Sequence, residues 1–254
     1  MKPSALVETV HDDGQQQSRE WDQPVLLDLF CGAGGASVGY ARAGFRVVGV
    51  DLHPQPRYPF EFFQADALTI LKRLSNGERV SGYGLHDFAA IHASPPCQGY
   101  STQTADQSKH ERLIEPVRAL LSWTGLPYVI ENVEGARKHL VNPVRLCGSM
   151  FGLDLRRHRY FEANWPLAGP PCNHSWQTPR FRSLDMSMVR AGRLASVVGV
   201  HGHINYSGEF ELRQKAMGID WMTNEELVEA IPPAYTEHIG RQLLAALEEE
   251  AQVA

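Results

Sequence analysis

Short apolar runs alternate with amphipathic segments through the first two thirds of the chain. Apolar runs of strand length occupy 24–30, 45–50, 61–64, 87–92, 127–130, 144–146 and 159–161. Segments of helical composition lie between several of them, at 36–43, 67–74 and 109–123. Strands that are buried on both faces read as nearly continuous apolar runs. The alternation therefore predicts an α/β fold with a mixed, mostly parallel sheet.

The pattern weakens in two places, and these places divide the chain. Residues 1–23 are polar and predict a disordered tail, and residues 166–210 are rich in Gly, Pro, Ser and Arg with little periodicity. Periodicity returns where Thr223 and Glu226 form a capping box, and a last helix is expected from Pro232 and Pro233 to about residue 250. We expect one main domain made of 24–165 and 211–254, with 166–210 as a small irregular insertion.

Composition narrows the class of protein further. The 254 residues carry 24 Lys and Arg against 29 Asp and Glu, so the net charge of −5 argues against a simple polybasic nucleic-acid binder. Four cysteines without a CxxC pair do not make a disulfide framework. No apolar run approaches the roughly 20 residues that span a bilayer, and the polar start has no secretory core. We therefore expect a cytoplasmic protein that does not bind membranes.

The first candidate site is the small-residue turn at 28–35 (DLFCGAGG), between a predicted strand and a helix. Such a turn lets a ligand approach the backbone, and the helix N-terminus offers free N–H groups. Asp51 ends the next strand, where a carboxylate can accept hydrogen bonds from ribose hydroxyls. No Gly-Lys-Ser/Thr follows, which argues against ATP or GTP. Taken alone, the turn could also be a tight turn without a ligand.

The second candidate is the segment 94–101 (SPPCQGYS), which follows a buried strand. Two prolines fix the backbone before Cys97, and Gly99 relaxes it afterwards. A thiol held in this way near a helix start or a basic group is expected to have a lowered pKa and to act as a nucleophile.

Two further polar motifs stand at the ends of strands. Glu131 leads the segment Glu-Asn-Val, where a carboxyl in a pocket can stay protonated or exchange a proton with a base. Arg157 and Arg159 are spaced i, i+2, so on a strand both would point to one face and could hold a phosphate or a carbonyl. As isolated motifs, both could equally be solvated surface charge.

Together these segments resemble the cytosine-5 DNA methyltransferase family. The turn at 28–35 is similar to its cofactor motif, and 94–101 is similar to its Pro-Cys nucleophile loop. Residues 131–133 match its Glu-Asn-Val motif, and Arg157 with Arg159 its paired-arginine motif. Its closing motifs are similar to 213–218 and 230–240.

The resemblance implies a Rossmann-like S-adenosylmethionine-dependent methyltransferase fold. It implies methyl transfer from S-adenosylmethionine to carbon 5 of cytosine in duplex DNA, through a covalent Cys97 adduct on a flipped-out base. The implied catalytic residues are Cys97, Glu131, Arg157 and Arg159. The implied cofactor contacts are Asp28, Phe30 (on the adenine), Gly32, Gly34, Gly35, Asp51 (on the ribose), Asp66 (on the adenine amino group) and Pro96. The implied substrate contacts are Ser94, Pro95, Gln98, Gly99, Ser101, Asn132 and Val133.

Three departures from the family stand out, two in the scaffold of the active site and one in the region for target recognition. Leu155 stands where the arginine motif has Gln, and Val228 with Glu229 precedes the last motif in place of Gly-Asn. Only about 50 residues, 160–210, remain for target recognition, whereas a specific DNA interface buries roughly 1,000 Å² or more. We expect a monomer with a short or degenerate target, in a restriction-modification or phage setting. The alternatives are the same chemistry on a free cytidine nucleotide or RNA, and a catalytically silent DNA-binding homologue.

Cysteine and histidine pairs in the insertion raise the question of a metal. Cys172 with His174, and His201 with His203, are each spaced i, i+2, which is tighter than the usual spacing of structural zinc ligands. We therefore expect polar loop contacts at these residues and no metal. Cys31 and Cys147 are expected to be buried and inert.

Overall fold

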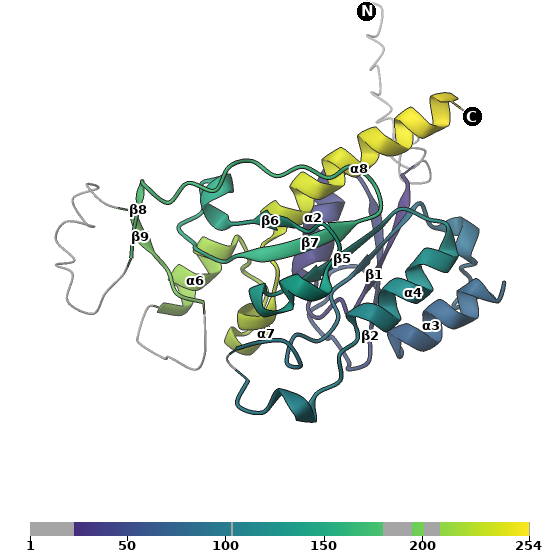
Figure 1. The fold of residues 1–254 in the computed structure, drawn as a ribbon, viewed down its shortest axis with the longest axis horizontal. Coiled ribbons are helices and arrows are strands. Elements are labelled where there is room, and N and C mark those ends of the chain that lie inside the picture. The colour runs from purple at the N-terminus through teal and green to yellow at the C-terminus, as the bar shows by residue number, and fades with distance from the viewer. Residues whose placement is uncertain (1–22, 103, 180–194, 201–208, 254) are drawn as a thin grey trace, which may run out of the picture.

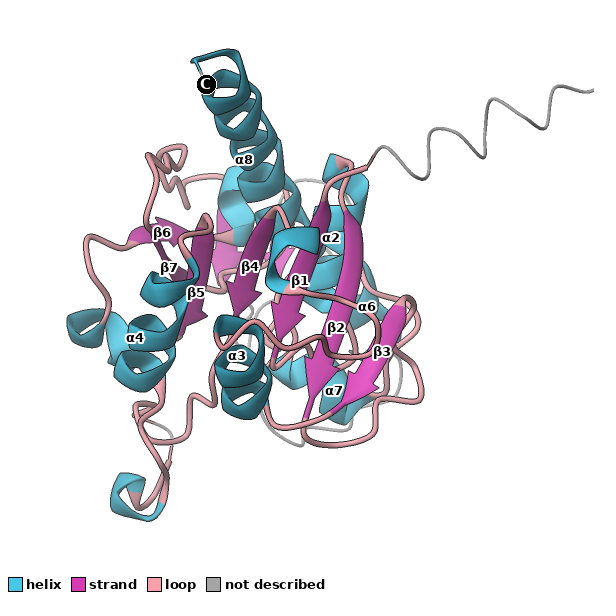
Figure 2. Cartoon of the chain, turned by 90° about the vertical axis from the view of Figure 1, so that its right-hand side faces the viewer, coloured by secondary structure: helices cyan, strands magenta, loops and turns pink. Residues whose placement is uncertain are grey.

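A seven-stranded sheet organises the protein in a computed structural model that describes residues 23–102, 104–179, 195–200 and 209–253. Figure 1 shows the sheet within the whole fold, and Figure 2 shows the strand order, β3-β2-β1-β4-β5-β7-β6. The strands are β1 (Val25–Leu29), β2 (Arg46–Asp51), β3 (Glu61–Gln64), β4 (Ala90–Ala93), β5 (Tyr128–Asn132), β6 (Val144–Leu146) and β7 (Arg159–Ala163). The predicted class, α/β with a mixed and mostly parallel sheet, is confirmed.

The direction of the strands decides which residues meet. Strands β3, β2, β1, β4 and β5 run parallel, while β7 is antiparallel to both β5 and β6. The carboxyl ends of β1, β4 and β5 therefore share one edge (Figure 2). The start of β7 joins them there, because Asn132 pairs with Tyr160. In an open sheet of this kind ligands bind beyond the carboxyl ends of the strands.

Helices cover both faces of the sheet. Helices α3 (Ala67–Ser75) and α4 (Ile114–Thr124) lie in front of it in Figure 2, and α2 (Gly35–Ala43) and α8 (Pro233–Val253) lie behind. Their apolar sides make two buried clusters, one around Leu71 and Leu121 and the other around Tyr40 and Tyr235. A third cluster joins Leu155 to α6 (Glu209–Met217) and α7 (Asn224–Glu229).

The contact between α2 and α8 depends on a residue without a side chain. A Cβ on Gly39 would lie 2.0 Å from Thr236 Oγ1 and 2.2 Å from the carbonyl oxygen of Pro233. We expect Gly39→Val to lower the free energy of unfolding by about 3 kcal/mol or more, because a packed backbone cannot yield that much space. Urea unfolding checks this, with the exposed Arg42→Ala on the same helix as the control. Equal losses in both variants would contradict the packing account.

Local patterns located most elements well, and one proline explains the main error. The helix predicted at 109–123 begins only at Ile114, after a short 3₁₀ turn at Gln107–Lys109. Pro116 has no N–H and its ring excludes the carbonyl of the preceding turn, so a helix can hold it only in its first turn. The capping box of Thr223 and Glu226 is confirmed, and α8 runs three residues beyond its predicted end.

The predicted insertion contains regular structure that its sequence did not indicate. Strands β8 (Gln177–Pro179) and β9 (Ala195–Val197) form a separate parallel pair beside α6 (Figure 1). His201 and His203 lie outside the described residues, as does the predicted tail up to Asp22. Among the described helices, none is both long and apolar enough to cross a membrane.

Candidate active site

The turn after β1 forms a backbone cradle at the sheet edge. Phe30, Gly32 and Gly34 all have positive φ, of 59°, 49° and 87°. Gly34 caps α2 without any side-chain hydrogen bond, and a Cβ there would lie 2.8 Å from the side chain of Pro59. A Cβ on Gly32 would meet nothing within 4 Å, whereas one on Gly35 would lie 2.5 Å from the carbonyl oxygen of Ile231. The turn thus packs on one side against the C-terminal segment and is open at Gly32.

Two acidic residues border this cradle. Asp51 accepts hydrogen bonds from the backbone N–H groups of Gly32 and His53, both at 3.0 Å. Asp66 caps α3 and accepts hydrogen bonds from the N–H and hydroxyl of Thr69 through one oxygen, Oδ1, so its other oxygen makes none of these contacts. Both carboxylates stand at the carboxyl ends of neighbouring parallel strands, Asp51 at the end of β2 and Asp66 after β3.

Asp28 lies behind the cradle and not in it. Its side chain is fully buried and accepts a hydrogen bond from Ser37, whose own oxygen accepts one from Tyr58 at 2.9 Å. The other oxygen of Asp28, Oδ1, is buried without a hydrogen-bond partner among the described residues, and the predicted cofactor contact stays a prediction. Burial raises the pKa of Asp28 from 3.8 to about 7, with Asp51 adding to the rise and the Ser37 hydroxyl opposing it.

The raised pKa of Asp28 makes stability depend on pH. Between about pH 4 and pH 7 the folded protein keeps Asp28 protonated while the unfolded chain ionises it, so Asp28 lowers the free energy of unfolding as the pH rises. We expect Asp28→Asn to gain up to about 4 kcal/mol relative to the wild type between pH 4 and pH 8. Urea unfolding across this range measures the difference. A difference that stays constant with pH would contradict the assignment.

The loop after β4 holds Cys97 by hydrogen bonds at both ends. The Ser94 N–H donates to the carbonyl of Leu29 at 3.1 Å, and the Asn132 side chain donates to the carbonyl of Pro95 at 2.9 Å. Beyond the thiol, the N–H groups of Tyr100 and Ser101 both donate to the carbonyl of Cys97 at 2.9 Å. The half-buried thiol is thus carried on a rigid turn at the sheet edge.

The pKa of Cys97 is raised, which corrects the expectation of a lowered value. Burial is the main cause, and the negative charges of Glu131 and Glu229 add to it. The positive charge of Arg159 and a backbone hydrogen bond act in the opposite direction. In the free protein the thiol is therefore mostly protonated, and its nucleophilicity depends on the charge states of Glu131 and Arg159.

Glu131 and Arg159 form a buried ion pair beside the thiol. Arg159 Nε lies 3.0 Å from Glu131 Oε1, but it is not aimed at that oxygen as a hydrogen bond requires, so Oε1 keeps an unused acceptor position. Burial raises the pKa of Glu131, while Arg159, Arg157 and the Ser94 hydroxyl oppose the rise. A buried carboxyl with one unsatisfied oxygen is suited to binding a polar ligand.

Arg157 lies outside the strand that begins at Arg159, and its hydrogen bonds go to backbone carbonyls. It precedes β7 and is buried, and its guanidinium donates to the carbonyls of Val200 at 3.0 Å and Val228 at 2.5 Å. Burial and the neighbouring Arg159 lower its pKa to about 9. Arg157 thus joins the start of β7 to the C-terminal segment, and only Arg159 reaches Glu131.

The remaining predicted contacts divide between the pocket and its support. Asn132 is buried and uses both ends of its amide within the protein, on Pro95 and on the Val133 N–H, so it supports the loop and does not face a substrate. Gly99 is packed against the backbone of Glu111, 2.8 Å from a hypothetical Cβ. The more accessible side chains are those of Ser94, Pro96, Gln98, Ser101 and Val133, while Pro95 is buried.

Three residues that the motifs did not single out complete the arrangement. The Trp221 indole donates to the carbonyl of Ala33 at 2.9 Å, and the Tyr235 hydroxyl donates to the carbonyl of Arg157 at 2.6 Å. Glu229 is close enough to Cys97 to raise its pKa. These contacts span 78 to 188 residues of sequence, so no local pattern could have indicated them.

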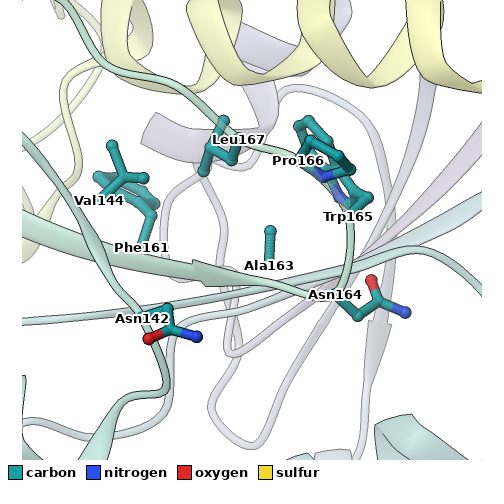
Figure 3. Close-up of a pocket in the computed structure, with 8 residues that line it drawn as sticks. All are labelled: Asn142, Val144, Phe161, Ala163, Asn164, Trp165, Pro166 and Leu167. Carbon is teal, nitrogen blue, oxygen red and sulfur yellow. The ribbon is translucent and has the colours of Figure 1, made fainter.

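A separate hollow lies away from these polar groups. It encloses about 420 Å³ between β6, β7 and the segment that follows, and Figure 3 shows Phe161, Ala163 and Trp165 among its lining residues. Ala163 pairs with Val129 near the start of β5, away from the edge that carries Glu131. The candidate site is therefore defined by converging polar groups and not by cavity size.

Comparison with known proteins agrees with this geometry. Residues 25–144 match the C-5 cytosine-specific DNA methylase family. The chain is 32% identical over 122 residues to the type II methyltransferase M.XorII of Xanthomonas oryzae pv. oryzae, a match covering 44% of this chain and 29% of that protein. It is 29% identical over 119 residues to M.AgeI of Thalassovita gelatinovora, covering 43% of this chain and 28% of that protein. The matched segment thus spans less than a third of these relatives.

Two solved structures share the fold over 89% of the chain. One is assigned as a DNA modification methyltransferase encoded within an E. coli prophage, with a TM-score of 0.53 at 16% identity and all of that chain covered. The other is the S. pombe Dnmt2 methyltransferase, with a TM-score of 0.51 at 15% identity and 99% of that chain covered.

The fold is that of the Rossmann-like S-adenosylmethionine-dependent methyltransferases. Within this class, the matched residues 25–144, just under half of the chain, are similar to the C-5 cytosine-specific DNA methylase family.

Proposed function

We propose that the protein transfers a methyl group from S-adenosylmethionine to carbon 5 of cytosine in DNA. The observation that carries the proposal is the convergence of Cys97, Glu131 and Arg159 at the sheet edge that also bears the open glycine cradle. The free acceptor position on Glu131 Oε1 supports a polar ligand at this place.

The cradle has the features that a cofactor with a ribose and an adenine needs. Gly32 is open to close approach, and the N-terminus of α2 has no side-chain cap. Asp51 would accept hydrogen bonds from the ribose hydroxyls, Asp66 from the adenine amino group, and Phe30 would lie against the adenine ring. When bound, S-adenosylmethionine supplies an electrophilic methyl group on a sulfonium.

Cys97 makes carbon 5 of cytosine reactive. This carbon is a poor nucleophile in the free base. The thiolate adds to carbon 6, and the electron pair of the ring double bond shifts toward carbon 5, which can then accept a methyl group. Loss of the carbon 5 proton and departure of the thiolate restore the double bond and release the enzyme.

Glu131 and Arg159 stabilise the ring during this addition. Charge that reaches ring nitrogen N3 is neutralised when Glu131, whose pKa is raised by burial, supplies a proton there and accepts a hydrogen bond from the amino group. Arg159 keeps the carboxyl in position, and Arg157 holds the segment before β7 through Val200 and Val228.

The DNA must present its base outside the helix, because carbon 6 is inaccessible in a stacked duplex. With about 50 residues between the arginine motif and the closing motifs, we propose a short or degenerate target and activity that falls steeply with salt. We further propose that it acts as a monomer in the cytoplasm, within a restriction-modification or phage setting.

Covalent trapping tests this function. A duplex with 5-fluorocytosine cannot lose the carbon 5 substituent, so we expect a denaturation-resistant protein–DNA adduct that requires S-adenosylmethionine. Cys97→Ala should form none, while His86→Gln, at an exposed residue outside the proposed site, should still form it. Labelled S-adenosylmethionine with competing duplex, dCMP and RNA identifies the acceptor. Cofactor binding without any adduct would contradict the proposal and favour a silent homologue.

A further inference from the structure

Two cysteines and two histidines converge where the predicted insertion meets the sheet. They are Cys147, His158, Cys172 and His174, and their sulfur and ring nitrogen atoms all lie within 4.8 Å of one another. Cys147 Sγ is 3.3 Å from His174 Nε2, and Cys172 Sγ is 3.1 Å from the same nitrogen and 3.6 Å from His158 Nε2. In the sequence, His201 and His203 stood out as the possible companions of Cys172 and His174. Cys147 and His158 did not, because they are distant along the chain.

These spacings are those of a tetrahedral metal site. With metal–sulfur bonds of about 2.3 Å and metal–nitrogen bonds of about 2.0–2.1 Å, tetrahedral ligand atoms stand roughly 3.4–3.8 Å apart. The measured separations of 3.1 to 3.6 Å fall close to that range. Two sulfur and two nitrogen ligands in a tetrahedron select zinc over magnesium or calcium, which prefer oxygen ligands.

We propose that Cys147, His158, Cys172 and His174 bind one zinc ion as a structural site. All four ligands come from the protein, so no coordination position remains open for catalysis. On binding, both thiols lose their protons to solvent and each neutral imidazole offers the lone pair of its Nε2.

Neighbouring groups have the arrangement of an outer shell. The Ser149 hydroxyl lies 3.4 Å from Cys147 Sγ and 3.6 Å from Cys172 Sγ, where it can donate to a thiolate. His158 turns its other nitrogen, Nδ1, toward Glu134 Oε2 at 3.9 Å. A carboxylate on the distal nitrogen orients a metal-binding histidine.

The position of the site explains what the ion would do. His158 stands between Arg157 and Arg159, and Cys147 follows β6, while Cys172 and His174 precede β8. One ion would thus fix the start of the insertion to the segment that carries Arg159 to Glu131. Cross-links of this kind replace apolar packing where the core is small.

Metal analysis of the full chain tests this site. We expect about one zinc ion per chain after purification with zinc present. Cys147→Ser and His174→Ala should lower the content at least about tenfold. Cys97→Ser and His86→Gln, which remove the same residue types elsewhere, should keep it. If a ligand variant fails to fold, the wild type settles the question: cobalt added after chelation should give the intense visible bands of tetrahedral cobalt and a thiolate charge-transfer band.

Two results would overturn the proposal. One is wild-type protein that carries no stoichiometric zinc and develops no tetrahedral cobalt spectrum. The other is a Cys147–Cys172 disulfide, seen as two titratable thiols instead of four in denaturant with chelator. Cys97→Ser should lose methyl transfer and keep its full zinc content. Failure of the metal proposal can therefore be distinguished from failure of the proposed reaction.

Discussion

Cys97→Ala is expected to reduce the rate of methyl transfer by about four orders of magnitude or more, because it removes the group that activates carbon 5. Binding of the cofactor should change little, since the cradle is built from the turn at 28–35 and from Asp51. Single-turnover transfer of labelled methyl to duplex DNA measures the first effect, and calorimetric titration with S-adenosylhomocysteine measures the second.

The pH dependence of the wild type supplies a further check on Cys97. Since burial and two acidic neighbours raise the pKa of the thiol, the reactive thiolate is a minor species at neutral pH and its fraction grows as the pH rises. Alkylation of Cys97 should therefore accelerate through the alkaline range. Transfer by Cys97→Ala within tenfold of the wild-type rate would mean that this thiol is not the nucleophile.

Glu131→Gln is expected to move two measurements in opposite directions. Methyl transfer should fall by about 10²–10⁴-fold, because glutamine cannot supply a proton to the ring. The thiol should become more reactive toward iodoacetamide, because the substitution removes a negative charge that raises the pKa of Cys97 and leaves the positive charge of Arg159 beside it.

If Glu131 only supported the fold, its substitution would loosen the site and reduce activity. It would not also lower the pKa of the Cys97 thiol. Glu248→Gln is the matched control, because Glu248 is exposed on α8, away from the site. It should leave both the alkylation rate and methyl transfer near the wild-type values. Parallel loss of both rates in Glu131→Gln would contradict the assigned role.

Local sequence patterns located the parts of the site that lie within one strand and its following turn. The first strand, the glycine turn and Asp51 stand where alternation and turn chemistry placed them, as do Cys97 after β4 and Glu131 near the end of β5. These features depend on neighbours a few residues away, because strand burial and turn conformation are set locally.

Charge states and partners could not be predicted in that way. The pKa of Cys97 was expected to be lowered, and its burial beside Glu131 raises it. Arg157 was expected to hold a ligand together with Arg159, and its guanidinium donates instead to the carbonyls of Val200 and Val228. Both outcomes follow from desolvation and from hydrogen bonds between residues far apart in the sequence. The spacing of residues within a motif does not indicate either of them.

The sequence by itself determined an α/β sheet with a glycine turn, a cysteine loop and a glutamate at strand ends, since periodicity and turn residues act over short distances. Only the tertiary structure decided that Glu131 meets Arg159 beside Cys97, and that Cys147 and His158 meet Cys172 and His174. The reason is that β7 runs back along β5 from the site edge, and such non-local pairing depends on the packing of the whole sheet.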